Sequence, residues 1–319
     1  SARIVYRQFQ ATPQYRWALL SERLGTDCWV KHENHTPVGA FKIRGGLTYF
    51  EQLARTGALP REVISATRGN HGQSIGWAAR AHGVACTIVV PHGNSVEKNA
   101  AMRALGVTLI EHGDDFQAAR EHAERLAAER GAHMVPSFHP ALISGVSTYW
   151  WEFFHAVPQL DVVYVPIGLG SGACSAIAAR RALGHRARIV GVVSTGATTY
   201  ADSMAAGRVV EARSSPGWPT EWRCAAPTPT RWPCCASTWT TSCRSATPRW
   251  PRPCATCSPT RTTLPKAPAR PPLPRPCRSA PASPIRWWVS RCVAATSMRA
   301  FLRRSFPNDN RPDPASNGH

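Results

Sequence analysis

Acidic residues, lysine and long apolar runs are all scarce in this sequence. Its 319 residues include 19 Asp and Glu against 38 Lys and Arg, and only four of those 38 are lysines. No apolar run approaches the roughly 20 residues that a membrane-spanning helix needs. No secretory or transit signature opens the sequence either. We therefore expect a cytoplasmic protein with no membrane partner, long enough for two domains.

The net charge of +19 suggests a nucleic-acid partner at first, but its distribution argues against one. Residues 1–213 carry 22 Lys and Arg against 16 Asp and Glu, whereas residues 214–319 carry 16 against 3. The same last third holds 20 of the 28 prolines, 8 of the 11 cysteines and 7 of the 12 tryptophans. Two kinds of sequence are joined near residue 213, and we expect no nucleic-acid partner for the first.

Between residues 60 and 197, short β-branched runs alternate with alanine-rich amphipathic stretches, a pattern typical of βα units around a parallel sheet. The predicted strands are 61–66, 85–91, 107–112, 132–136, 161–167 and 188–193. The predicted helices are 72–82, 96–105, 115–130, 142–154 and 172–183. The fold class is therefore α/β. Beyond Arg213 proline and turn formers interrupt every segment, so we expect neither helix nor strand there.

The segment KHENHTPVGAFKIRGG, residues 31–46, places a single lysine among glycines. A lysine can bond to a carbonyl carbon when its amine is partly neutral, and burial beside Phe41 and Val38 would lower the pKa of Lys42 toward that condition. A surface lysine in a Gly-rich turn is the alternative that this segment alone leaves open.

A second segment, ATRGNHGQS at residues 66–74, lies where a predicted strand gives way to a helix. Asn70 and the surrounding backbone N–H groups would then face the crevice at the carboxyl ends of the strands, where α/β sheets bind ligands. A capped turn with no ligand is the alternative.

A third segment, VYVPIGLGSGACSAIAAR at residues 163–180, runs from a buried strand through Gly168, Gly170 and Gly172 into a helix. Such a turn presents N–H donors suited to one phosphate. It lacks the Lys-Ser/Thr ending of a nucleotide P-loop and the full dinucleotide fingerprint, so ATP and NAD fit poorly. An activated lysine, an Asn-Gly turn and a cup for one phosphate together suit a phosphorylated aldehyde cofactor.

Residues 8 to about 213 resemble the fold type II pyridoxal-phosphate enzymes, in particular the serine/threonine dehydratase (threonine ammonia-lyase) family. The family's K-x-E-x-x-Q-P-x-G-S-F-K-x-R-G motif is matched at Lys31, Glu33, Pro37, Gly39, Phe41, Lys42, Arg44 and Gly45. The resemblance implies a two-domain fold like that of the tryptophan synthase β subunit, with open, mostly parallel sheets flanked by helices. It implies a large domain formed by residues 1–54 and 141–213, and a small α/β domain formed by residues 55–140.

The resemblance also implies a role for each matched position. Lys42 would bond to pyridoxal 5'-phosphate and remove the α-proton, Phe41 would pack near the cofactor ring, and Asn70 would bond its phenolic oxygen. The expected phosphate cradle is Gly168, Leu169, Gly170, Ser171 and Gly172, and the expected substrate contacts are Thr67, Arg68, Gly69 and His71. The two glycines after Arg44 are expected to let cofactor and substrate approach the backbone.

Several positions depart from the family pattern. Thr36 and Ala40 replace the usual Gln and Ser, and Arg68 stands where serine racemases place a second acid/base serine. Racemase activity is therefore disfavoured, and Arg68 could meet a substrate carboxylate instead. The family's divalent-metal site would need acids in place of Val193 and Thr199, so no metal is expected.

The function implied is dehydration of L-threonine or L-serine to a 2-keto acid and ammonium, by a homodimer or homotetramer. Three alternatives stay open: a dehydratase for a bulkier substrate such as 3-hydroxyaspartate or phenylserine, a β-replacement or threonine synthase-like enzyme, and a nucleic-acid binder that uses the basic tail. The other histidines are expected to be solvated or core residues, and Glu111, Asp114 and Asp115 are expected to end a strand or cap a helix.

Residues 214–319 lack the family's later motifs as written, but a shifted reading frame restores them. Read two bases later, codons for Trp218–Arg223 permit Ala-Asp-Gly-Met-Ala, and those for Pro265–Arg270 permit Glu-Gly-Ala-Gly-Ala. Codons for Cys292–Met298 permit Cys-Gly-Gly-Asn-Val-Asp at the same offset. We therefore predict a frame change between about Ser214 and Trp218, and weak or absent cofactor binding if the tail is real. The single Cys254-x-x-Cys257 pair is a weak zinc candidate.

Overall fold

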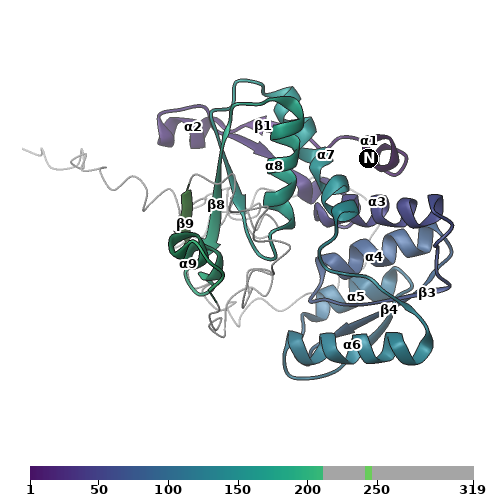
Figure 1. Ribbon diagram of the computed structural model, residues 1–319. Coiled ribbons are helices and arrows are strands. Elements are labelled where there is room, and N and C mark those ends of the chain that lie inside the picture. The colour runs from purple at the N-terminus through teal and green to yellow at the C-terminus, as the bar shows by residue number, and fades with distance from the viewer. Residues whose placement is uncertain (211–240, 246–319) are drawn as a thin grey trace, which may run out of the picture.

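The computed structural model describes residues 1–210 and the backbone of residues 241–245 (Figure 1). The predicted tail, with its proposed frame change and its Cys254-x-x-Cys257 pair, otherwise lies outside the described residues. The helices are α1 (Ala2–Tyr6), α2 (Ala18–Leu24), η1 (Glu33–His35), α3 (Lys42–Arg55), α4 (Asn70–Ala81), α5 (Val96–Ala104), α6 (Phe116–Arg130), α7 (Pro140–Ala156), α8 (Ser171–Leu183) and α9 (Thr199–Ala206). The strands are β1 (Gln14–Arg16), β2 (Trp29–Lys31), β3 (Glu62–Ala66), β4 (Ala85–Val90), β5 (Thr108–Glu111), β6 (His133–Met134), β7 (Val162–Pro166), β8 (Arg188–Ser194) and β9 (Thr241–Ser245).

Two parallel sheets, each flanked by helices, confirm the predicted α/β fold class. The first has the strand order β5-β4-β3-β6. Helix α6 covers one face of this sheet, where Ala119, Ala123 and Ala127 pack on Ile64 and Val89. The other face packs against α4, α5 and α3. Small alanine side chains let α6 approach the sheet closely.

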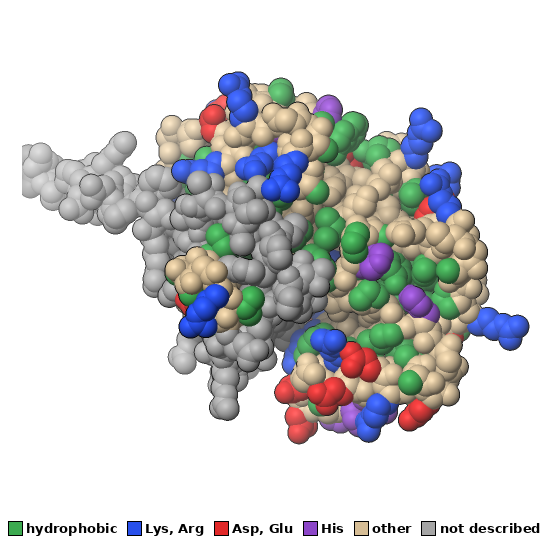
Figure 2. All heavy atoms as spheres, viewed as in Figure 1, with side chains coloured by type: hydrophobic (Ala, Val, Ile, Leu, Met, Phe, Trp, Pro, Cys, Tyr) green, Lys and Arg blue, Asp and Glu red, His purple; other side chains and the backbone are tan. Residues whose placement is uncertain are grey.

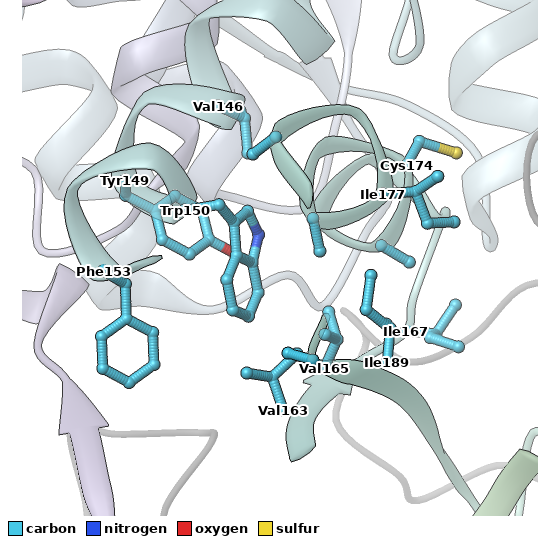
Figure 3. Close-up of a cluster of buried hydrophobic side chains, with 14 of the residues drawn as sticks. Val146, Tyr149, Trp150, Phe153, Val163, Val165, Ile167, Cys174, Ile177 and Ile189 are labelled. Carbon is cyan, nitrogen blue, oxygen red and sulfur yellow. The ribbon is translucent and has the colours of Figure 1, made fainter. Parts of the chain in front are cut away.

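The second sheet has the order β7-β8-β9 and packs against α7 and α8. Figure 3 shows the interface: Trp150 of α7 points toward Val163 and Val165 of β7, and Ile177 of α8 belongs to the same cluster. Strand β8 is buried from Ile189 to Ser194, as expected for a parallel strand covered on both faces.

Helix α3 lies between α4 and α7, and its glycines explain how closely the three helices pack. A Cβ added to Gly45 would lie 2.8 Å from the Leu142 carbonyl oxygen of α7, and one added to Gly46 would lie 2.7 Å from the Ser74 carbonyl oxygen of α4. The expectation that these two glycines make room for the cofactor is therefore wrong. They make room for neighbouring helices.

The predicted strands and helices between residues 60 and 197 are all confirmed, with ends shifted by a few residues. The expectation of no strand beyond Arg213 is wrong at β9, which pairs in parallel with β8 from Val190 to Ser194. A five-residue strand needs only a free edge to pair with, so proline-rich flanking sequence does not exclude it. The division into a large and a small domain stays a prediction.

On the face shown in Figure 2, basic side chains lie in several separate places, and acidic side chains mix with them over α6 at the lower edge. Exposed ion pairs on α6, such as Arg120 with Glu124, contribute to this mixture. This face of the described residues therefore has no single basic patch of the kind that binds nucleic acid. No helix in the described part of the chain is both long enough and apolar enough to cross a membrane.

Candidate active site

Lys42 is the first residue of α3, and its amine reaches the Gly-rich turn before α8. Its Nζ donates a hydrogen bond of 2.7 Å to Ser171 Oγ, and its backbone carbonyl accepts one of 2.6 Å from Ser74 Oγ of α4. The side chain is half-buried. Residues 129 positions apart in the sequence therefore meet here, which excludes the alternative of a solvated lysine in a turn.

The turn from Gly168 to Gly172 links β7 to α8 and is held from both sides. Tyr200 of α9 donates a hydrogen bond of 3.1 Å to the Leu169 carbonyl, and the indole N–H of Trp150 donates one of 3.2 Å to the Gly172 carbonyl. Gly170 has φ = 92°, in the left-handed region, and a Cβ there would lie 2.7 Å from Tyr200 Oη. The backbone of this turn is therefore fixed before any ligand binds.

Among the described helices of nine or more residues, the N-termini divide into two groups. Helices α5, α6 and α7 have side-chain caps, from Ser95, Asp115 and His139; the capping prediction for Asp115 is thus confirmed. The N-cap residues of α3, α4 and α8 are Phe41, Gly69 and Gly170, and none supplies a side-chain cap.

Within this set, the uncapped termini are the ones that carry Lys42, Asn70 and Ser171; the shorter helices α1, α2 and α9 also lack a side-chain cap. The N–H groups of the first turn have no partner within a helix and need one from elsewhere. In α4 and α8 these first turns are largely buried. A buried helix end without a cap is suited to an anionic ligand, because the N–H groups and the helix dipole both favour negative charge.

The Asn70 turn follows β3 at the carboxyl edge of the first sheet. Thr67 Oγ1 accepts a hydrogen bond of 3.1 Å from the Gly69 N–H, which fixes the turn ahead of α4. The side chains of Arg68 and Asn70 are half-buried. The alternative of a turn capped by a side chain is excluded, because α4 has no such cap.

His71 is buried in the second position of α4. Burial and then the charge of Lys42 lower the pKa of His71 to about 3, although a hydrogen bond to the Pro136 backbone carbonyl partly opposes them. Nε2 has no partner among the described residues, so Nδ1 is the nitrogen that donates to Pro136. The imidazole is therefore neutral near pH 7 with a buried lone pair on Nε2.

Phe41 lies beside both Lys42 and the first turn of α8. Its ring centroid is 5.6 Å from Lys42 Nζ and 5.7 Å from the Tyr149 ring. A Cβ added to Gly172 would lie 3.6 Å from Phe41 Cζ. The structure thus brings Phe41, Lys42, Ser171 and Gly172 together, and it places the Asn70 turn next to them through His71.

The residues behind Lys42 form a buried charge network. The sequence analysis matched some of them to the family motif but did not predict that they interact. The Arg44 guanidinium is fully buried and bonds Glu33 through Nε, at 2.8 Å, and through Nη2, at 3.0 Å. It also bonds Glu152 of α7 through Nη1, at 2.5 Å, and through Nη2, at 3.0 Å. Lys31 Nζ donates to the same Glu152 at 2.6 Å.

Glu152 is the member of this network that the sequence did not reveal. Burial alone would raise its pKa, but hydrogen bonds and charge from Arg44 and then Lys31 outweigh burial, so the pKa of Glu152 is lowered. Thr148 Oγ1 accepts a further bond of 2.9 Å from Arg44. A glutamate inside the aromatic run YWWEFF is the one signal that could have indicated a buried partner.

The two departures from the motif before Lys42 bond to each other. Thr36 Oγ1 accepts a hydrogen bond of 2.9 Å from the Ala40 N–H and donates one of 2.9 Å to the Ala40 carbonyl. The loop that leads into α3 is therefore closed by a threonine. Within the described ranges, no group of three or more His, Cys, Asp or Glu side chains could hold a metal ion.

Comparison with known proteins matches residues 5–241 to the family described as pyridoxal-phosphate dependent enzyme. The chain is 33% identical over 191 residues to the biosynthetic L-threonine dehydratase of Haemophilus influenzae, covering 60% of this chain and 37% of that protein. It is 32% identical over 200 residues to the L-threo-3-hydroxyaspartate ammonia-lyase of Saccharomyces cerevisiae, covering 62% of this chain and 61% of that protein. It thus spans less than two thirds of the length of these relatives.

A solved structure supports the same relationship. The processed form of threonine deaminase isoform 2 from Solanum lycopersicum superposes with a TM-score of 0.71 at 26% identity, covering 76% of this chain and 71% of that one. The family match ends at residue 241, beyond the residue 213 where the sequence resemblance ends, and β9 begins there.

Proposed function

Because this chain belongs to the family of pyridoxal-phosphate-dependent enzymes, we propose that it is an ammonia-lyase that converts L-threonine or L-serine to a 2-keto acid and ammonium. The observation that carries the proposal is the 2.7 Å contact between Lys42 Nζ and Ser171 Oγ. It puts Lys42, the motif lysine expected to bond to the cofactor, at the turn suited to the phosphate. The assembly expected from the sequence is a homo-oligomer.

The residues present fit the cofactor. The uncapped first turn of α8 offers backbone N–H groups from Ser171 onward for a phosphate. The Gly168–Gly172 turn, with Leu169 in it, leaves the backbone open to a ligand because it carries few side chains. Phe41 provides an apolar surface beside Lys42, and Asn70 at the start of α4 offers an amide for a phenolic oxygen. When bound, pyridoxal phosphate supplies an electron sink for charge that develops at the substrate's α-carbon.

Lys42 has two tasks in the proposed reaction. Its amine would hold the aldehyde end of the cofactor, and once the substrate amine takes that place, the freed Lys42 would accept the α-proton. Ser171 Oγ orients the amine through the hydrogen bond described above. The β-hydroxyl would then leave as water with the proton that Lys42 accepted. A second water would hydrolyse the carbon–nitrogen bond and release ammonium, so one water is lost and one is consumed.

The substrate contacts follow from the Asn70 turn. Thr67, Arg68, Gly69 and His71 lie on or beside the uncapped end of α4, which favours the carboxylate of the amino acid. Its N–H groups, rather than a metal ion, are expected to orient the substrate. The half-buried side chain of Arg68 adds a cation on the same turn.

The test is spectroscopic and kinetic. Purified full-length protein mixed with pyridoxal phosphate should show the visible absorption band of a lysine-bound cofactor and should form keto acid from L-threonine or L-serine without an added thiol. Lys42→Ala should lose the band and lower turnover by roughly 100- to 10,000-fold, as expected for a removed acid/base group. A band that persists in Lys42→Ala would overturn the proposal.

One second candidate has an observation in its favour. The chain is about as similar to the yeast hydroxyaspartate ammonia-lyase as to the Haemophilus threonine dehydratase, and Arg68 could pair with a second carboxylate. Parallel assays with L-threonine and L-threo-3-hydroxyaspartate separate the two. A higher kcat/KM for the dicarboxylate, lost in Arg68→Ser, would favour this candidate.

A further inference from the structure

Lys98 lies over the Asn70 turn although it belongs to a different βα unit. It is in the first turn of α5, whose N-cap Ser95 follows β4. A Cβ added to Gly69 would collide with Lys98 Cδ and would lie 3.3 Å from both Lys98 Cγ and Cε. The aliphatic stem of Lys98 is therefore packed flat against Gly69, the N-cap residue of α4.

Lysine is rare enough in this protein for its positions to carry information. Of the 38 Lys and Arg residues, the lysines are Lys31, Lys42, Lys98 and Lys266. Within the described residues, Lys31 bonds Glu152 behind the site, and Lys42 bonds Ser171 within it. The other two described lysines therefore lie in or directly behind the candidate site.

The amine and the guanidinium are not equivalent at such a place. Lysine is a compact charge on a slim, flexible stem, whereas the guanidinium of arginine is a wide planar fork. A stem that lies against a glycine backbone suits the slimmer side chain. Burial lowers the pKa of Lys98, and a nearby anion would raise it again.

The surface that Lys98 covers already favours an anion. The first turn of α4 is uncapped and largely buried. Its second residue, His71, has a buried Nε2 with no partner among the described residues, which is an acceptor for a ligand hydroxyl or N–H group. A carboxylate together with an amine or hydroxyl group is the chemistry of a β-hydroxy amino acid. A full positive charge beside the helix end would strengthen carboxylate binding beyond what backbone dipoles give.

We propose that Lys98 is a substrate-binding residue whose ammonium group pairs with the carboxylate of the amino-acid substrate at the N-terminus of α4. This inference rests on the proposed function. Two βα units would then form the substrate site, with the N–H groups supplied by the β3–α4 turn and the charge supplied by α5.

The test compares three variants of the full-length holoenzyme. Lys98→Met keeps an apolar stem against Gly69 and removes the charge, and Lys98→Arg keeps the charge on a wider group. Arg103→Met is the matched control, because it removes a cation from the same helix whose side chain is 55% exposed and 3.5 Å from Glu111.

Lys98→Met should raise KM for L-threonine or L-serine by about 10- to 100-fold, the range expected for a lost hydrogen bond between charged groups. We expect kcat, the visible absorption band and the melting temperature to change little, Lys98→Arg to recover part of the KM, and Arg103→Met to match the unmodified protein. As a readout without turnover, acetylation of Lys98 by acetic anhydride, followed by mass spectrometry, should slow when the amino acid is added.

Two results would overturn the inference while leaving the proposed function in place. One is an unchanged KM in Lys98→Met, with Lys98 acetylated equally fast with and without the amino acid. The other is a joint loss of the absorption band and thermal stability in Lys98→Met, which would mark a structural role. A protein that shows no Lys42-dependent absorption band at all would overturn both proposals together.

Discussion

His71 is the residue whose ionisation the fold alters in the most testable way. Its pKa of about 3 lies below the ordinary value of 6.5 because the ring is buried and close to Lys42. Between these two values the unfolded chain binds a proton that the folded chain does not. Stability should therefore fall as pH is lowered from 6.5 toward 3, by up to about 1.4 kcal/mol per pH unit from this group.

Urea unfolding at pH 7.0 and pH 4.5 measures this contribution. His71→Gln should reduce the loss of unfolding free energy between the two pH values. His155→Gln should leave it unchanged because His155 is exposed. Other buried histidines keep part of the pH dependence in every variant. The same loss in His71→Gln as in the unmodified protein would contradict the assignment of His71 as a neutral, buried imidazole.

Among single residues, those that could be predicted from the sequence lie in short motifs. Lys42 and the glycines from Gly168 to Gly172 are recognisable because each lies in a short segment of distinctive spacing. The partnership of Glu152 with Arg44 joins residues 108 positions apart, and the orphaned Nε2 of His71 depends on what packs around the ring. Neither could be predicted without the packed helices.

Among the elements, α3 and α7 are joined by the charge network of Arg44, Glu33, Glu152 and Lys31. The side chains of Arg44 and Glu152 are 0% and 4% exposed, so water cannot replace a lost partner. Glu152→Gln would remove the carboxylate that both Arg44 and Lys31 bond. We expect it to lower the unfolding free energy by about 3–5 kcal/mol, the usual cost of breaking a buried ion pair from one side.

The control for this prediction is Glu124→Gln on α6. Glu124 pairs with Arg120 at 2.8 Å, but the two side chains are 47% and 51% exposed, and such pairs contribute at most about 1 kcal/mol. Urea unfolding of both variants, at low and high salt, separates the two cases. Equal losses in Glu124→Gln and Glu152→Gln would show that the buried network contributes no more than a surface pair.

Substitution by alanine should have different effects at two glycines in neighbouring helices. A Cβ at Gly145 of α7 would lie 2.7 Å from the Arg44 carbonyl carbon, whereas a Cβ at Gly172 of α8 has its nearest neighbour at 3.6 Å. Gly145→Ala should therefore cost about 1–3 kcal/mol of stability through overpacking. Gly172→Ala should fold with unchanged stability and bind pyridoxal phosphate more weakly.

Thermal unfolding without cofactor, together with titration of the visible absorption band, tests both glycine predictions. A stable Gly145→Ala protein would mean that α3 and α7 can separate slightly at no cost. Unchanged cofactor affinity in Gly172→Ala would mean that the first turn of α8 does not contact the ligand.

The elements that sequence reasoning predicted are those with a clear period. The βα units from residue 60 to 197 have buried strands and long helices, so apolar spacing identifies them. Helix α3 escaped prediction because its first turn reads as a glycine-rich turn, and the glycines are explained only by α4 and α7 on either side. Strand β9 escaped it because its pairing with β8 depends on a free sheet edge rather than on its own composition.

At the scale of the whole molecule, the residue types of β9 do not suit its place in the sheet. It lies beside β8, which is buried from Ile189 to Ser194, and strands next to a buried parallel strand are typically rich in valine and isoleucine. The segment Thr241–Ser245 reads TSCRS instead. The place in the sheet is filled, but the residue types are not those that such a place favours.

A shifted reading frame resolves this mismatch. Read two bases later, the codons for Trp239–Ser245 permit Asp-Asp-Val-Val-Ser-Val, a β-branched strand, at the same offset that restores the three family motifs elsewhere in the last third. We predict that the coding sequence changes frame between about Ser214 and Trp218.

Independent sequencing of the DNA across those codons should find a one- or two-base difference from the reading that yields this chain. The corrected chain should bind pyridoxal phosphate more tightly than the chain as written, because β8 gains an apolar neighbour and the sheet that supports the Gly168–Gly172 turn is completed. Titration of the visible absorption band in both chains measures the difference. An uninterrupted frame in every read would mean that residues 214–319 are genuine. Equal affinity in the two chains would mean that β7 and β8 support the turn by themselves.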